Sequence, residues 1–512
     1  MTDLATTAVG GVTLPAPEAG APASRGQASE RLDRSLIGGL AWTGATRWAT
    51  QLIGWAATLV VVRLLAPSDY GLVGMALVYL GFMQLVNEFG LGAAIIQQRH
   101  MTEDQVARIN GFAVILGVGF VLFSVLVAGT VAGFFDQPAV RGIIVVASLT
   151  LLLAAVQVVP RALLARDLAF KRLAWVDGGE AITATVATLT LAALGARYWS
   201  LVVGPLVGRL ASTILLGLWR PHRAAWPRRF HSIAGSVEFG WHVVVARLAW
   251  YFYSNADFLV IGRVLGNVAL GAYTIGWTVA SMPVDRITAL VGSVAAPVFA
   301  SVQDDRAALR RYLRNLTEAV AFVTFPAAVG LAIVADEFVV TVLGPQWRPA
   351  ILPLRLLALA AALRSVSTLL PYVVVATGHA RRNMQLTAMA ALILPFLFYA
   401  GTRWGIAGVA AAWVIGHPLV VMPWFLFFAL RLTELRLPDY LRALGPAALG
   451  TGIMAAAVLG VRSLTPGDWP VPAALALHVL TGALVYAGIA YSARRERLRS
   501  LWELFRELRR AA

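Results

Sequence analysis

Two stretches of this chain, 200 residues apart, decide its fold. Residues 45–65 read ATRWATQLIGWAATLVVVRLL, and residues 245–265 read VARLAWYFYSNADFLVIGRVL. They align without a gap and share seven of twenty-one positions. The most informative matches are Arg47/Arg247 and Arg63/Arg263, and Gly71/Gly271 continues the register. Two arginine pairs in apolar surroundings are hard to explain by chance, so the pattern indicates an internal repeat.

The composition places the chain in a membrane. Of its 512 residues, 59% are hydrophobic and 13% charged, and the mean hydropathy is +0.74. Soluble proteins are about 45–50% apolar and about 25% charged, so this chain has too little polar surface for a water-soluble fold. It contains no cysteine, which excludes disulfides, thiolate metal sites and a cysteine nucleophile.

Apolar spans separated by short polar loops predict an all-α polytopic membrane protein with about fourteen transmembrane helices. Each span is long enough to cross a hydrocarbon core of about 30 Å. The predicted spans are 36–62, 70–97, 109–134, 142–164, 174–195, 198–219, 235–262, 268–300, 315–343, 351–377, 384–402, 405–430, 443–461 and 471–492. Helices 1 and 7 of this series run in the same direction, which predicts two six-helix lobes related as parallel repeats, plus two extra helices.

This count divides the chain into five predicted regions. The first 34 residues lack an apolar run and are expected to be a disordered cytoplasmic tail. The lobes are predicted at 35–225 and 226–431, and the two extra helices at 432–492. Residues 493–512 predict a basic amphipathic helix lying on the cytoplasmic leaflet, and a solvated helix packed on a loop is the alternative.

The net charge of +16 is mainly a topology signal. With the amino terminus inside, 29 basic residues fall on the predicted cytoplasmic side and 7 on the opposite side. Cytoplasmic loops of membrane proteins carry such an excess, so both termini are predicted to be cytoplasmic. Anionic lipid explains the charge better than nucleic acid does, and no nucleic-acid partner is expected.

Six basic residues remain inside the predicted spans, and Arg47 and Arg247 are the most informative of them. Arg47 lies sixteen residues before Arg63, about 24 Å from the outer boundary, and Arg247 lies at the matching depth. Each could snorkel to cytoplasmic headgroups. Alternatively the pair faces a cavity between the lobes, where Gln51 adds a polar group and two guanidinium forks would suit a pyrophosphate or carboxylate.

Other polar residues inside the spans are weaker candidates. Arg209 and Arg364 either line the cavity or pair with an acid. Glu88 could pair with Arg47, and Glu238 and His242, one helical turn apart, could couple protons or form a solvated pair. The remaining candidates for coupling or gating are Asn255, Asp257 and the kink-forming Pro283.

Nothing in the sequence predicts an enzyme. No HExxH, GxSxG or phosphate-binding GxxxxGK motif occurs, and the predicted outer loops are too short for a catalytic domain. No cofactor and no metal site is expected. A membrane polymerase or ligase is therefore disfavoured.

Two runs carry a family resemblance. RLLAPSDYGLVGMALVYLGFMQLVNEFGLGAAIIQ (Arg63 to Gln97) resembles the amino-terminal signature of bacterial polysaccharide transporters, which are lipid-linked oligosaccharide flippases of the multidrug/oligosaccharidyl-lipid/polysaccharide (MOP) superfamily. NADFLVIGRVLGNVALGAYTIGWTVASMP (Asn255 to Pro283) resembles the start of the second lobe, most like the colanic-acid-type (WzxC-like) branch. The resemblance covers most of the chain from about Ser35.

The resemblance implies a V-shaped transporter of the inner membrane. It would flip an undecaprenyl-pyrophosphate-linked oligosaccharide repeat by alternating access, with lipids and the lipid-linked sugar as partners. A proton or sodium ion could drive it, and polysaccharide assembly proteins could bind it. Arginines of the central cavity would receive the anion, a role that Arg47 and Arg247 match in kind. The alternative is an ion-coupled drug exporter of the same superfamily, which would favour acids and aromatics over arginines.

Overall fold

The structure is a computed structural model that describes residues 54–87, 95, 101–226, 248, 250–252 and 254–493. All regular structure within these ranges is helical, and they contain no strand. The predicted all-α membrane fold is therefore confirmed. Of the predicted tails, 1–34 lies outside the described residues, and so does all of 493–512 except Ala493.

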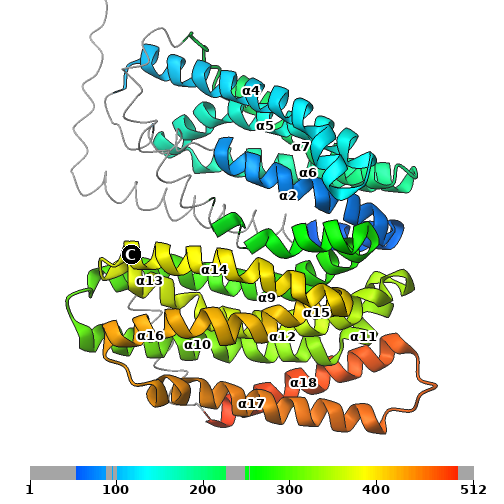
Figure 1. Ribbon diagram of the computed structural model, residues 1–512, viewed down its shortest axis with the longest axis vertical. Helices are drawn as coiled ribbons and strands as arrows, with labels where there is room; N and C mark the ends of the chain where they lie inside the picture. Colours follow the sequence, from blue (N-terminus) through cyan, green and yellow to red (C-terminus); the bar gives the residue numbers. More distant parts are fainter. Residues whose placement is uncertain are drawn as a thin grey trace, which may run out of the picture.

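The amino-terminal group of helices fills one half of the molecule (Figure 1). It comprises helix Gly54–Leu64, α2 (Pro67–Asn87), α4 (Glu103–Phe135), α5 (Ala139–Arg166), α6 (Phe170–Ala193) and α7 (Tyr198–Trp219). α4 begins with a capping box in which Thr102 and Gln105 satisfy each other's backbone N–H groups. Asp136, in a left-handed conformation with φ 54°, ends the same helix.

The second group occupies the other half, and the last two helices lie on its far side (Figure 1). Its first helix includes 254–264. It continues with α9 (Gly266–Ser301), α10 (Arg306–Ile333), α11 (Ala335–Phe338), a π-helical turn (Val339–Leu343), a 3-10 turn (Pro345–Ala350), α12 (Ile351–Ser367), α13 (Leu369–Ala376), α14 (Ala380–Gly401), a second 3-10 turn (Thr402–Trp404), α15 (Gly405–Ala411), the π-helical η5 (Ala412–Val421) and α16 (Met422–Thr433). The far pair is α17 (Leu437–Leu464) and α18 (Val471–Ala493).

Ten helical stretches of the described chain are long and apolar enough to cross a membrane. One of them, Ala380–Thr433, contains both α14 and α15–α16. α6 is not among the ten, because Asp177 and Glu180 make it less apolar. With α6 and the two partly described helices that end at 64 and 264, the structure agrees with about fourteen spans.

The register of the sequence repeat reappears where α2 crosses α9. A Cβ added to Gly71 would collide with the carbonyl oxygen of Asn267, and one added to Gly271 would collide with that of Pro67. Positions 67 and 267, like 71 and 271, are 200 apart. The two helices therefore touch backbone to backbone through equivalent positions, and glycine is needed at both for so close an approach.

Among the described residues, the apolar core joins the lobes at one end. The cluster that contains residues of both lobes, such as Met75 and Leu270, is concentrated toward the end predicted to face outward. At the end predicted to be cytoplasmic, the clusters around Ile109 and around Phe299 each stay within one half of the molecule. In the described part of the chain, the lobes are thus held together near the predicted outer end.

Candidate functional site

Asp257 is the centre of a buried cluster in the second lobe. Helix 254–264 places its side chain, with no exposed surface, between α9 and η5. One carboxylate oxygen accepts from the Tyr273 hydroxyl at 2.6 Å and from the Trp413 indole Nε1 at 2.9 Å, and the other accepts from the backbone N–H of Phe258 at 2.9 Å. These three donors compensate for burying a carboxylate.

Aromatic rings extend this cluster toward Arg364. Trp277 lies 6.4 Å from Tyr273 and 5.4 Å from Trp413, measured between ring centroids. The guanidinium of Arg364 lies 4.6 Å from the Trp277 centroid and donates to Ser281 Oγ at 3.0 Å and to Asp285 at 3.1 Å. Because the Asp285 side chain is 59% exposed, one end of this ion pair remains accessible.

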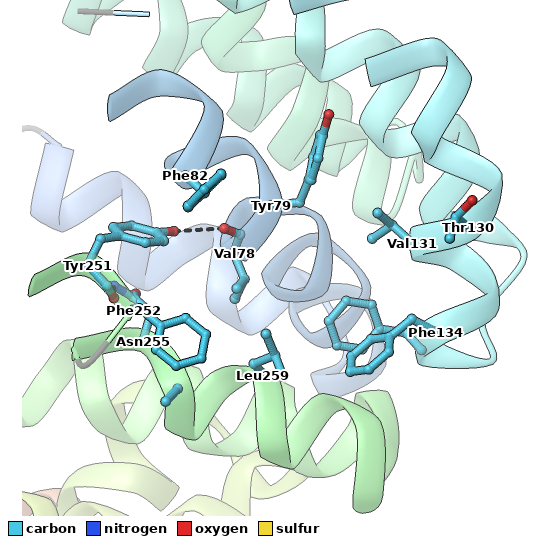
Figure 2. Close-up of a pocket in the computed structure, with 12 residues that line it drawn as sticks. Val78, Tyr79, Phe82, Thr130, Val131, Phe134, Tyr251, Phe252, Asn255 and Leu259 are labelled. Atoms are coloured by element: carbon cyan, nitrogen blue, oxygen red, sulfur yellow. Dashed lines mark hydrogen bonds between the residues drawn. The ribbon is translucent and has the colours of Figure 1, made fainter. Parts of the chain in front are cut away.

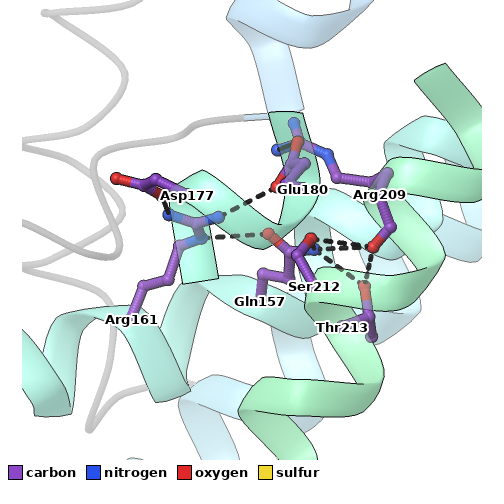
Figure 3. Close-up of polar contacts among 7 residues, drawn as sticks. All are labelled: Gln157, Arg161, Asp177, Glu180, Arg209, Ser212 and Thr213. Carbon is purple, nitrogen blue, oxygen red and sulfur yellow. Dashed lines mark hydrogen bonds and ion pairs between the residues drawn. The ribbon is translucent and has the colours of Figure 1, made fainter. Parts of the chain in front are cut away.

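A second charged network lies inside the first lobe, between α5, α6 and α7 (Figure 3). Arg161 binds Asp177 at 2.5 Å and Glu180 at 3.1 Å, and Glu180 also binds Arg209 at 3.1 Å. The buried Gln157 accepts from Arg161 and donates to the backbone of Arg209 and to two hydroxyl groups, those of Ser212 and Thr213. Two arginines and two carboxylates thus neutralise one another between three helices of the first lobe.

An apolar cavity of about 360 Å³ opens between the lobes (Figure 2). α2 and α4 form one wall, and helix 254–264 together with Tyr251 and Phe252 forms the other. Tyr251 crosses between the walls and donates its hydroxyl to the carbonyl of Val78 at 2.9 Å. The lining residues are Val78, Tyr79, Phe82, Thr130, Val131, Phe134, Phe135, Tyr251, Phe252, Asn255, Ala256 and Leu259.

The structure describes some of the candidates predicted from the sequence and not others. Arg209 and Arg364 each pair with a carboxylate, so of the two alternatives the geometry shows acid pairing. Asn255 lines the apolar cavity, and Pro283 lies within α9, which continues through it. The candidates Arg47, Gln51, Glu88, Glu238, His242 and Arg247 lie outside the described residues.

Sequence reasoning did not identify Gln157, Arg161, Asp177 or Glu180 as site residues. Arg161 is counted above among the cytoplasmic basic residues, whereas it lies within α5, five residues before the helix ends. The available signal was the pair Asp177 and Glu180, two acids one helical turn apart in an otherwise apolar span. In the described part of the chain, no three histidine or acidic side chains gather as a metal site would require.

Comparison with known proteins gives this architecture a context. Residues 60–352 match the sequence profile of a family described as "Polysaccharide biosynthesis protein". The lipopolysaccharide biosynthesis protein WzxC of Escherichia coli K12 is 25% identical over 396 residues, covering 75% of this chain and 79% of WzxC. The teichuronic acid biosynthesis protein TuaB of Bacillus subtilis 168 is 25% identical over 467 residues, covering 89% and 95%.

A solved structure shares the fold. The structure described as lipid II flippase MurJ in an inward closed conformation superimposes with a TM-score of 0.71, covering 90% of this chain and all of that chain. The sequence identity is 14%, so this likeness concerns the fold alone.

Proposed function

Because the chain belongs to the polysaccharide biosynthesis protein family, we propose that it flips lipid-linked oligosaccharide repeat units across the membrane by alternating access. The match over 60–352 carries this proposal, since it includes both helices of the inter-lobe crossing, α2 and α9. The names of WzxC and TuaB place those relatives in the synthesis of surface polysaccharides. An undecaprenyl-pyrophosphate carrier is the substrate class that such a role requires.

We propose that this multi-pass protein lies in a bacterial inner membrane, as its family membership suggests. The excess of basic residues on one predicted side, 29 against 7, supports an orientation with both termini in the cytoplasm. Under this orientation the lobes join at the periplasmic end. The lobes would comprise residues 35–225 and 226–431, with 432–492 as the added pair.

The pyrophosphate and sugar need cations and hydrogen-bonding groups between the lobes. Arg47 and Arg247, with Gln51, would receive the pyrophosphate near the cytoplasmic side. Arg364 is supported as a second contact, because its partner Asp285 is accessible and Trp277 offers a ring beside it. Arg209 would contribute indirectly, because its ion pair with Glu180 fixes the position of the Arg209 guanidinium.

The hydrocarbon chain of the substrate must remain in apolar surroundings while the headgroup crosses. The cavity between α2, α4 and helix 254–264 supports this requirement, because its lining is apolar apart from Thr130, Asn255 and two tyrosine hydroxyls (Figure 2). A chain lying there would extend from the bilayer to the space between the lobes. Tyr251 would then separate this chain from the polar path.

Coupling and partners complete the proposal. A proton or sodium gradient would drive the cycle, and polysaccharide assembly proteins would receive the product. The protein would act as a transporter without catalysing a covalent step. The coupling and gating candidates are Glu88, Glu238, His242, Asn255, Asp257 and Pro283.

Reconstitution tests the function directly. Purified protein in vesicles containing a fluorescent undecaprenyl-pyrophosphate oligosaccharide should bring the sugar within reach of an enzyme added outside. Arg47→Ala and Arg247→Ala should each slow this transfer, and Arg403→Ala, in an exposed turn, serves as the matched control. Equal rates in all four proteins would show that the two arginines snorkel.

A drug exporter of the same superfamily is the second candidate. The accessible carboxylate of Asp285 and the ring of Trp277, both of which contact Arg364, favour it, because acids and aromatic rings suit organic cations. Ethidium efflux from the same vesicles distinguishes the candidates. Ethidium efflux without sugar transfer would favour the drug exporter and refute the flippase proposal.

A further inference from the structure

Contacts at the predicted outer end join the first lobe to one irregular segment of the second. Arg63 donates through Nε to the carbonyl of Val342 at 2.8 Å and through its terminal nitrogen to that of Thr341. Gln346 donates its side-chain N–H to the Arg63 carbonyl at 3.1 Å. Every one of these bonds crosses from residue 63 to the segment after α10.

Trp347 completes the junction. It is fully buried and donates its indole N–H to the carbonyl of Val62 at 2.9 Å. Its ring meets Tyr70 of α2 edge to face, with centroids 5.4 Å apart. The segment thus combines an apolar anchor with hydrogen bonds to the first lobe.

The shape of this segment explains why its carbonyls are available. The π-helical turn Val339–Leu343 ends at Gly344, whose φ of 109° is accessible mainly to glycine. The last carbonyls of a helix have no partner within the helix. Thr341 and Val342 therefore present acceptors that Arg63 uses.

The same segment is tied to the two added helices by ion pairs. Asp336 binds Arg355 of α12 and, at 3.0 Å, Arg462 at the end of α17. Arg462 also binds Glu337 at 3.3 Å, and His478 of α18 lies 3.4 Å from the same carboxylate. The outer ends of α17 and α18 thus hold the beginning of the segment that reaches the first lobe (Figure 1).

The repeat supplies a counterpart on the opposite side. Arg263, the equivalent of Arg63, places its guanidinium 5.7 Å from the ring centroid of Phe134 at the end of α4. Arg263 therefore contacts the end of the third helix of the first lobe, whereas Arg63 contacts the segment that follows the third helix of the second lobe. The Arg63 side carries hydrogen bonds, whereas Arg263 shows a cation–π contact.

We propose that Arg63 and the 335–350 segment form a latch that keeps the lobes closed at the outer end, and that α17 and α18 brace this latch through Asp336 and Glu337. The outer ends cannot separate without breaking the Arg63 bonds and uncovering Trp347. This inference rests on the alternating access of the proposed function. It assigns the added helices a part in that cycle.

Spin-label distances test the latch without requiring transport. The chain has no cysteine, so Leu194→Cys with Trp404→Cys labels the outer end of both lobes on a clean background. Arg172→Cys with Arg381→Cys labels the other end. Arg63→Ala should lengthen the outer distance and shorten the inner one, changing the ratio of the two states by about tenfold or more, the factor expected for one charge-assisted hydrogen bond.

Three further variants give each part of the proposal its own outcome. Arg63→Lys keeps the positive charge but has one nitrogen where arginine has two that reach separate carbonyls, so it should fall between wild type and Arg63→Ala. Arg403→Ala should leave both distances unchanged. Arg462→Gln touches only the second lobe and its added helices, yet should shift the outer distance in the same direction. Unchanged distances in Arg63→Ala overturn the latch, and a lower melting temperature of Arg462→Gln with unchanged distances overturns the bracing.

Vesicle assays separate this inference from the proposed function. If distances shift as expected but no sugar is transferred, the latch stands and the flippase proposal fails. If sugar is transferred and the distances in Arg63→Ala match wild type, the flippase proposal stands and the latch fails. Should Arg63→Ala prove too unstable to purify, Arg63→Lys decides: a distribution identical to wild type overturns the latch, and an outward shift supports it.

Discussion

Replacing Asp257 with alanine should destabilise the second lobe strongly. The substitution removes the acceptor shared by the Tyr273 hydroxyl and the Trp413 indole, both of which are buried. A buried donor that loses its acceptor costs about 1–3 kcal/mol, so loss of the carboxylate that accepts from the Tyr273 hydroxyl should by itself cost about this much. Part of this loss is offset, because a carboxylate no longer has to be buried.

Asp257→Asn should be much milder. The amide oxygen can occupy the position that accepts from both Tyr273 and Trp413. The amide NH₂ then faces the backbone N–H of Phe258, which loses its side-chain acceptor. Losing one hydrogen bond of this kind costs about 0.5–1.5 kcal/mol. The asparagine variant should therefore unfold at a clearly higher denaturant concentration than the alanine variant.

A double-mutant cycle isolates the shared acceptor. Tyr273→Phe alone loses one bond, but in the Asp257→Ala background it removes a donor that is already unpaired. The two free energies of unfolding should therefore deviate from additivity by about 1 kcal/mol or more, as residues in one network do. Denaturant titration of the purified protein in detergent measures all four variants. Additive effects would refute the shared-acceptor geometry.

The remaining predictions concern transport and stability elsewhere. Glu180→Gln should lower the melting temperature, because it leaves the part-buried Arg209 without its acid. Adding Arg209→Gln should restore part of the loss, and a greater loss in the double variant would contradict the ion pair. Arg364→Lys should slow sugar transfer more than it lowers stability, because lysine keeps the charge and loses the planar fork; unchanged transfer excludes a substrate contact. Leu259→Trp should fill the inter-lobe cavity and slow transfer, while Leu126→Trp, on the exposed face of α4, should not; equal rates would remove the cavity from the path.

Hydropathy located the spans because one physical cause, the thickness of the membrane, sets their length. Helix ends were placed less well where polar capping extends a helix beyond its apolar part. α4 begins at Glu103, six residues before the predicted 109, because the Thr102 and Gln105 capping box starts it. α10 begins at Arg306 instead of 315, because Asp305 caps a polar start whose first nine residues include four arginines.

Pairing between side chains was beyond the sequence. Arg209 and Glu180 are 29 residues apart on neighbouring helices, and their contact depends on how α6 and α7 are rotated about their axes. Periodicity in an almost uniformly apolar helix gives no such rotation, because no face is distinctly polar. The sequence placed Gly71 and Gly271 in the same register of the repeat, and the structure shows that both lie where α2 crosses α9.

The departure from symmetry is as informative as the symmetry. The first lobe turns from its third to its fourth helix through the short loop 136–138, whereas the second lobe uses 335–350 for the same connection. A perfect repeat would give Arg63 and Arg263 the same kind of contact, but only Arg63 finds free carbonyls in such a segment. The insertion also supplies Asp336 and Glu337, the acids to which α17 and α18 attach. Because one segment contacts both the first lobe and the added helices, any motion that separates the outer ends must either release Arg63 or carry α17 and α18 with it.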